Sequence, residues 1–114
     1  MSGRGQAAED FAAAYVEQRG LTIVARNFHC RFGEIDLIAK EGKTLVFIEV
    51  RMRSNDAFGG AAASITAGKR EKLLRTARHY LSDFTVAPAC RFDAVLLSGR
   101  AGEHIEWIRD AFGE

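Results

Sequence analysis

The 114-residue sequence has only two cysteines, one proline and a formal net charge of +1. Cys30 and Cys90 form no C-x-x-C pair, so we expect free thiols in a reducing cytoplasm and not a disulfide or a zinc site. The small net charge gives no compositional sign of a nucleic-acid binder. No segment is apolar and long enough for a membrane span, and the first residues lack the apolar run of a secretory signal. These absences predict a cytoplasmic protein without a membrane partner.

A hydrophobic fraction of 47% and a charged fraction of 27% are those of an ordinary globular protein. At this length we expect one domain over residues 1–114 with one core. Apolar residues at helical spacing, among them Ala8, Phe11, Ala12 and Tyr15, predict a helix over residues 6–19. A second helix is predicted from an N-cap at Thr66 to about residue 84. Strands are expected over residues 21–28, 33–40, 44–51, 90–97 and 103–108.

The hairpin made by residues 33–40 and 44–51 is the centre of the sequence. If Gly42 and Lys43 form a two-residue turn, Asp36 lies opposite Glu49, and Glu34 lies opposite Arg51. A register two residues away would instead place Glu34 opposite Glu49. Either register gathers acidic side chains on one face, and because like charges destabilise a sheet, the arrangement calls for an explanation.

Two interpretations of this acidic face stay open on spacing alone. It could be a solvated face on which Lys40, Lys43 and Arg51 balance the acids. It could also be a divalent metal site, because Mg²⁺ binds one or two carboxylates together with waters and a substrate phosphate oxygen. The pattern of an Asp followed by Glu49-x-Arg51 is loose and has many chance matches, so spacing alone favours the solvated face.

Three further features bear on function. The second predicted helix is strongly basic, which fits a solvated face and a phosphate-contacting face equally well. Glu9 is expected at the edge of the first helix's apolar stripe, where it could point along the sheet or satisfy the helix dipole. Residues 52–60 are predicted to form a loop, either a substrate contact or a plain connector. The basic side chains of the helix are Lys69, Arg70, Lys72, Arg75, Arg78 and His79.

The order of these motifs resembles the YraN family of bacterial proteins. The resemblance rests on a first helix containing Glu9, the strand ending Arg26-Asn27-Phe28, the run Gly33-Glu34-Ile35-Asp36-Leu37-Ile38, and Phe47-Ile48-Glu49-Val50-Arg51. It continues through Ser54, Phe58-Gly59, Lys69, Arg91-Phe92-Asp93 and Ala111-Phe112, and so covers nearly the whole chain. The family is similar to restriction-endonuclease-like nucleases, the PD-(D/E)-x-K superfamily, which includes archaeal Holliday-junction resolvases.

The resemblance implies an α/β fold, a mixed sheet flanked by two helices in the order αβββαββ. It also implies that Asp36, Glu49 and Glu9 bind Mg²⁺ or Mn²⁺, while Glu34 matches a signature position without an assigned role. Arg51 departs from the pattern, because the family usually has lysine there. Arginine stays protonated and cannot act as a general base, although it can stabilise charge on a phosphate. Lys69 or Lys72 could replace the lysine if they reach the site.

The expected function is therefore a metal-dependent endonuclease that cleaves DNA, either structure-selectively or nonspecifically. Asp36, Glu49, Glu9 and Arg51 are its expected catalytic residues. Backbone phosphates would be contacted by Arg53, Lys69, Arg70 and Lys72, with affinity that falls with salt. By analogy with relatives that act on branched DNA, a homodimer is a further expectation. The alternatives are a non-catalytic nucleic-acid-binding module on the same fold and an interaction protein without a metal.

Overall fold

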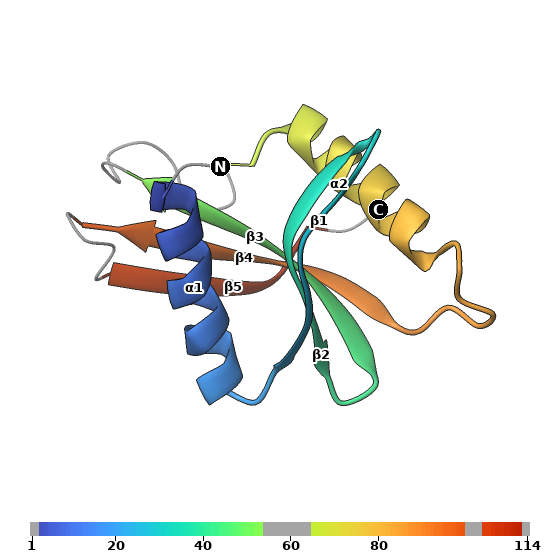
Figure 1. The fold of residues 1–114 in the computed structure, drawn as a ribbon, viewed down its shortest axis with the longest axis horizontal. Coiled ribbons are helices and arrows are strands. Elements are labelled where there is room, and N and C mark those ends of the chain that lie inside the picture. Colours follow the sequence, from blue (N-terminus) through green and yellow to red (C-terminus); the bar gives the residue numbers. More distant parts are fainter. Residues whose placement is uncertain (1–2, 54–64, 100–103, 113–114) are drawn as a thin grey trace.

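The computed structural model describes residues 3–53, 65–99 and 104–112, without the side chains of residues 3–5 and 53. The elements follow the predicted αβββαββ order (Figure 1). Two of them are helices, α1 (Gly3–Gln18) and α2 (Ala67–Leu81). The strands are β1 (Thr22–Cys30), β2 (Gly33–Glu41), β3 (Thr44–Arg53), β4 (Cys90–Ser98) and β5 (His104–Phe112). The predicted contact loop at residues 52–60 begins later than expected, because β3 extends through Arg53, and residues 54–64 lie outside the described part.

The described strands form one mixed sheet in the order β1-β2-β3-β4-β5. The β3–β4 pair is parallel and the other neighbouring pairs are antiparallel. A parallel pair needs a long crossover connection, and α2 lies within that connection. The predicted fold class is thus confirmed, and the β2–β3 register is the one expected from a two-residue turn at Gly42 and Lys43. Gly42 has a φ of 61°, a conformation that glycine adopts without steric cost.

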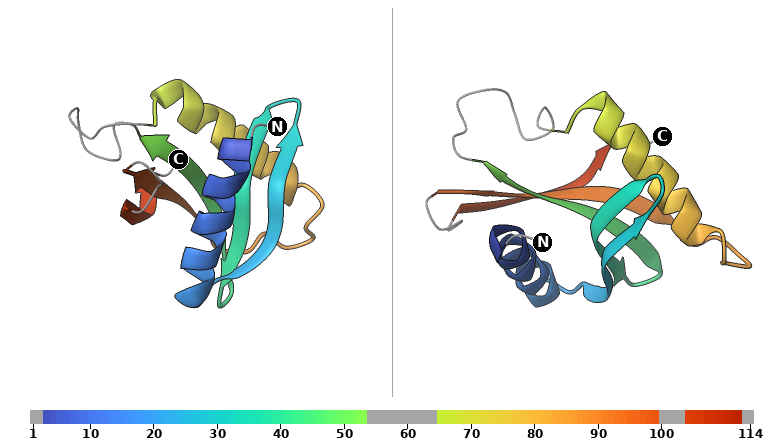
Figure 2. Two further views of the ribbon diagram at one scale, coloured as in Figure 1. Left: turned by 60° about the vertical axis from the view of Figure 1, so that its left-hand side comes forward. Right: turned by 45° about the horizontal axis from the view of Figure 1, so that its top comes forward.

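The two helices cover opposite faces of the sheet (Figure 2). On the α1 face, Ala12 and Val16 pack with strand residues such as Leu37 and Ile48. On the α2 face, Leu73 and Ala77 join a core that contains the stacked rings of Phe47, Phe92 and Phe112. Strand side chains alternate between the two faces of the sheet, and a helix covers each face, so the side chains on both faces of the central strands are buried. No helix among the described residues is long and apolar enough to cross a membrane.

The predicted buried face of the first helix and the predicted end of the second need correction. Phe11 is 45% exposed, whereas Ala13 and Val16 are buried, so the buried stripe of α1 is rotated from the predicted one. Small alanines at 12 and 13 let the helix approach the sheet closely, and Glu9 lies within this buried face and not at its edge. α2 ends at Leu81, earlier than the predicted end near residue 84, and Phe84 beyond it is 42% exposed.

A buried ionic network occupies the α1 face where β4 meets β5. Asp93 is fully buried, and its carboxylate accepts hydrogen bonds from Arg91 Nε, Trp107 Nε1 and the backbone N–H of Asp110, at 3.0, 2.9 and 2.9 Å. Arg91 also donates to Glu41 at 2.6 Å. The backbone N–H of Asp110 is available because β5 bulges here, with φ of 52° at Asp110. Every carboxylate oxygen of Asp93 is satisfied, so the network stabilises the fold.

Candidate functional site

The strands β2 and β3 separate where the acidic residues lie. Their ladder ends at the pair Leu37–Ile48. Beyond it, β2 continues with β1 to the pair Gly33–Cys30, and β3 continues with β4 to Arg53–Ser98. Each strand therefore follows a different neighbour, and the β1–β2 hairpin turns away from β3 (Figure 2, right). The expected cross-strand pairs of Asp36 with Glu49 and of Glu34 with Arg51 are not part of the ladder, because it ends before them. On its other edge β2 keeps its partner, and Glu34 pairs with His29 of β1.

A backbone kink accompanies this separation. Ile35 packs in the α2-side core, whereas Leu37 packs in the α1-side core, so the predicted alternation of side chains breaks at Asp36. On β1, Asn27 lies between the pairs Arg26–Leu37 and Phe28–Ile35 and has a φ of 53°. Non-glycine residues rarely adopt positive φ, and asparagine is among the most tolerant of them. The kink brings the carboxyl group of Asp36 to the end of the ladder.

The carboxylate of Asp36 replaces the missing ladder partner of β3. Its Oδ2 accepts a hydrogen bond from the backbone N–H of Val50 at 2.8 Å. The pKa of Asp36 is raised to about 7, first by burial and second by the negative charge of Glu49. A hydrogen bond between the two carboxyl groups raises the pKa further, and the Val50 N–H opposes the shift. Asp36 and Glu49 thus converge as an acid pair that is repulsive when both are ionised.

Glu49 is held between two cations. Its side chain is 6% exposed, and its Oε2 lies 3.5 Å from Arg51 Nη1 and 3.5 Å from Lys69 Nζ. Arg51 comes from the same strand, whereas Lys69 comes from the first turn of α2. Thr66 fixes that turn, because its hydroxyl accepts the backbone N–H of Lys69 at 3.2 Å. Lys69 therefore does reach the acid pair.

Glu9 approaches the same region from α1. Its side chain is buried, and its Oε1 has no hydrogen-bond partner among the described residues. The pKa of Glu9 is raised, first by burial and then by the charge of Asp36, while a hydrogen bond with Asn27 lowers it. A buried polar atom without a partner costs about 1–3 kcal/mol, and more when the group is charged. A cation near Asp36 would relieve that cost.

The remaining basic candidates lie in different surroundings. Arg70 donates from Nε to the backbone oxygen of Ile65 at 3.1 Å, and its guanidinium lies 5.8 Å from the ring centre of Phe112. Lys72 is exposed and lines a pocket beside Phe32. The side chain of Arg53 lies outside the described part of the chain, as do Ser54 and Phe58-Gly59.

The residues present fit a hydrated divalent cation better than a fully protein-bound one. Within the described ranges, no group of three or more His, Cys, Asp and Glu side chains could hold a metal ion. The Asp36–Glu49 pair remains, and Glu9 lies close enough to Asp36 for the charge of Asp36 to raise the pKa of Glu9. Mg²⁺ typically takes one or two carboxylates and keeps several waters, so a pair suffices. A cation bound by Asp36 and Glu49 would lower the raised pKa of Asp36. Its waters would give the Glu9 oxygen a hydrogen-bond partner.

Sequence reasoning did not assign roles to two residues that shape the site. Asn27 supplies the kink in β1 and a hydrogen bond to Glu9. Val50 contributes only its backbone N–H to Asp36. The Arg26-Asn27-Phe28 motif included Asn27 but did not reveal its positive φ. Val50 gave no side-chain signal, because its contact with Asp36 is made by the main chain.

Comparisons with known proteins agree with this architecture. The sequence model of Uncharacterised protein family UPF0102 matches residues 8–97. A UPF0102 protein of Nitrosomonas europaea is 60% identical over 97% of this chain and 94% of the relative. Another, from Methylobacillus flagellatus, is 58% identical over 98% of both.

Among solved structures, Hjc of Archaeoglobus fulgidus, a Holliday junction resolvase, superposes with a TM-score of 0.60 and 19% identity. The superposition covers 89% of this chain and 72% of Hjc. At this identity the likeness establishes the fold. The chain belongs to the UPF0102 family, also called the YraN family, and has the fold of a Holliday junction resolvase.

Proposed function

We propose that the protein is a metal-dependent endonuclease that hydrolyses DNA phosphodiester bonds, selecting DNA by its structure and not by its base sequence. The observation that carries the proposal is the convergence of Asp36 and Glu49 at the point where β2 and β3 separate. Two cations, Arg51 and Lys69, lie beside the same acid. Acidic side chains can bind a metal ion, and cationic side chains beside them can bind the phosphate group that the metal contacts.

Asp36 and Glu49 would hold Mg²⁺ or Mn²⁺, with Glu9 accepting hydrogen bonds from its waters. Such an ion, when bound, polarises the phosphate and lowers the pKa of a bound water. Lys69 and Arg51 would then contact the non-bridging phosphate oxygens, where negative charge grows as a water oxygen bonds to phosphorus. The attacking water loses a proton to the surrounding water as the phosphorus–oxygen ester bond breaks on the opposite side, and the leaving oxygen takes up a proton from water.

Binding is expected to depend mainly on phosphates. No described element carries a base-reading motif, and the cations beside the acid pair come from α2 and β3. Phosphate contacts by Lys69, Lys72, Arg70 and Arg53 would make affinity fall steeply with salt. The name of the Archaeoglobus relative points to four-way junctions, so branched DNA is the first substrate to test. Symmetric cutting of such a junction would use two copies of this chain, a homodimer in the cytoplasm.

The decisive test incubates labelled duplex, single-stranded, flap and four-way DNA with protein and Mn²⁺. We expect cut products from wild type and none from Glu49→Gln. Glu106→Gln is the matched control, because Glu106 is exposed on β5, on the far side of β4 from the acid pair. Equal cutting by wild type and Glu49→Gln would show that a contaminating nuclease, and not this site, makes the products.

A second function has its own supporting observation. Arg51 stands where the family usually has lysine, which favours a nucleic-acid-binding module that has lost catalysis. The same assay separates the two: binding of branched DNA without cut products in Mg²⁺ or Mn²⁺ supports the module. If the protein binds neither metal nor DNA, the third alternative remains, an interaction protein whose acid pair holds no metal.

A further inference from the structure

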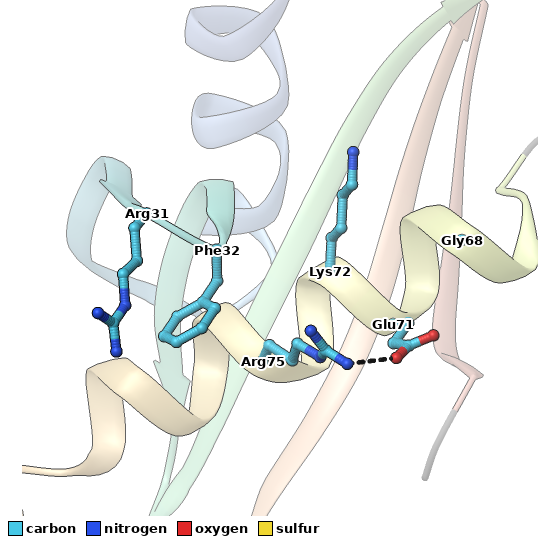
Figure 3. A pocket seen from close by; sticks show the side chains of 6 residues that line it. All are labelled: Arg31, Phe32, Gly68, Glu71, Lys72 and Arg75. Carbon is cyan, nitrogen blue, oxygen red and sulfur yellow. Dashed lines mark hydrogen bonds and ion pairs between the residues drawn. The ribbon is translucent and has the colours of Figure 1, made fainter.

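A second concave surface lies beside the acid pair, where the turn between β1 and β2 meets α2. This pocket has a volume of about 380 Å³ and is lined by Arg31, Phe32, Gly68, Glu71, Lys72 and Arg75. Figure 3 shows Arg31 and Phe32 on the turn side of the pocket, with Lys72 and Arg75 on the helix side. Neither Arg31, Phe32 nor Arg75 takes part in the site described above.

The turn is held tightly against the helix. A Cβ atom at Gly33 would lie 3.1 Å from Thr76 Oγ1 and 3.6 Å from Lys72 Cβ, so the close approach depends on glycine. The ring of Phe32 also packs against His79, with ring centres 5.9 Å apart. These contacts place the half-buried Phe32 ring at a set position on the pocket wall.

The pocket combines an aromatic face with positive charge. Arg31, Lys72 and Arg75 supply three cations, and Glu71 supplies one carboxylate, which Arg75 pairs with at 2.8 Å. Three positive charges less one negative charge leave two in excess around the ring. The guanidinium carbon of Arg31 lies 4.9 Å from the centre of the Phe32 ring. Aromatic stacking next to backbone-tracking cations is the chemistry by which proteins hold single-stranded nucleic acid.

The pocket lies one helical turn along α2 from Lys69, the lysine that contacts Glu49 of the acid pair. Lys72 follows Lys69 by three residues on α2, so the two lie on neighbouring turns of one face, about 4.5 Å apart along the axis. Lys69 contacts Glu49, and Lys72 lines the pocket. A DNA strand with a phosphate at Glu49 would therefore reach the pocket with one of its next nucleotides.

We propose that this pocket binds one unpaired nucleotide of single-stranded DNA, with its base stacked on Phe32 and its flanking phosphates near Lys72, Arg31 and Arg75. The proposal rests on the proposed function, and it names the feature of DNA structure that the enzyme selects. In an intact duplex the bases are stacked inside and cannot meet Phe32. At a flap, a nick or a junction, an unpaired base is available. Selectivity for distorted DNA then comes from one aromatic side chain.

The test measures binding without a metal, so cleavage does not enter. Fluorescence anisotropy compares a flap DNA and a blunt duplex of the same length for wild type, Phe32→Leu and Phe84→Leu. Phe84→Leu is the control, because Phe84 is an exposed aromatic residue just beyond the opposite end of α2. Loss of one base–aromatic stack predicts about 5- to 140-fold weaker flap binding by Phe32→Leu. Duplex binding should change less than about twofold, and Phe84→Leu should match wild type.

A fluorescent base supplies a second measurement. With 2-aminopurine as the flap nucleotide, wild type and Phe32→Tyr should quench its emission by stacking, and Phe32→Leu should not. Equal weakening of flap and duplex binding, or unchanged quenching in Phe32→Leu, would overturn the inference. If Phe32→Leu binds and cuts flap DNA as well as wild type does, the pocket proposal is overturned and the nuclease proposal stands. Ring-dependent binding without any cutting would support the pocket and count against the nuclease.

Discussion

Lys69 Nζ of α2 lies 3.5 Å from Glu49 Oε2 of β3, the same distance as Arg51 Nη1. The acid therefore has a lysine beside it even though the expected lysine two residues later is an arginine. This lysine comes from α2, so it lies beside Glu49 without a lysine at position 51 of the strand. This arrangement allows the two cations to be tested separately.

Replacing Lys69 by glutamine should reduce the cleavage rate by about 100-fold, the effect of removing one charge-stabilising donor. Arg51→Lys should raise the wild-type rate and should partly restore cleavage to the Lys69→Gln protein, since it returns a lysine to Glu49. Single-turnover cleavage of four-way DNA with Mn²⁺ gives these rates. If Arg51→Lys lowers the rate in both backgrounds, the site has adapted to arginine.

Metal binding should require the acid pair and benefit from Glu9. Calorimetric titration with Mn²⁺ should give heat with wild type, none with Asp36→Asn, and about 10-fold weaker binding with Glu9→Gln, the effect expected when an outer hydrogen-bond partner is lost. Glu17→Gln is the control for Glu9, because it makes the same change on the exposed face of α1. Identical heats from wild type and Asp36→Asn would remove the metal from this site.

The raised pKa of Asp36 should make the metal-free protein sensitive to pH. In the unfolded chain this carboxyl titrates near its ordinary value of 3.8, and in the folded protein near 7. Between these values the folded state binds more protons, so stability is fully present below pH 4 and is lost as the pH rises through 7. Urea unfolding should show Asp36→Asn more stable than wild type at pH 8 and similar to it at pH 4. The same difference at both pH values would mean that Asp36 ionises normally.

Asp93 should matter for stability and not for chemistry. Asp93→Ala leaves Trp107 Nε1 and the N–H of Asp110 without their acceptor, and it leaves Arg91 with Glu41 alone. Breaking a buried charge pair costs about 3–5 kcal/mol. Urea unfolding measures this loss, with Glu106→Gln as a surface control. Cleavage per folded molecule should stay at the wild-type level at low temperature. A stable Asp93→Ala protein that no longer cuts would give Asp93 a role in the reaction.

Local chemistry in the chain was enough to predict the helices and strands along the sequence, although β5 runs to Phe112 and not to residue 108. It also predicted the hairpin register on the condition of a two-residue turn, whereas the mixed sheet was implied by the family resemblance. Gly42 and Lys43 can close a two-residue turn, and that turn sets the pairing of Glu41 with Thr44 and of every pair down to Leu37 with Ile48. Thr66 likewise marks the start of α2 through a hydrogen bond three residues away. Hydrogen-bond spacing and side-chain alternation depend on neighbours in sequence, so they can be read from it.

Tertiary packing decided how the acids meet their partners. The end of the β2–β3 ladder depends on β1 and β4 drawing the two strands apart, and no local pattern contains that competition. The burial of Glu9 follows from how closely Ala12 and Ala13 let α1 approach the sheet. The 3.5 Å contact of Lys69 with Glu49 follows from the packing of α2 on the other face. These distances join residues far apart in the chain, so only the folded core determines them.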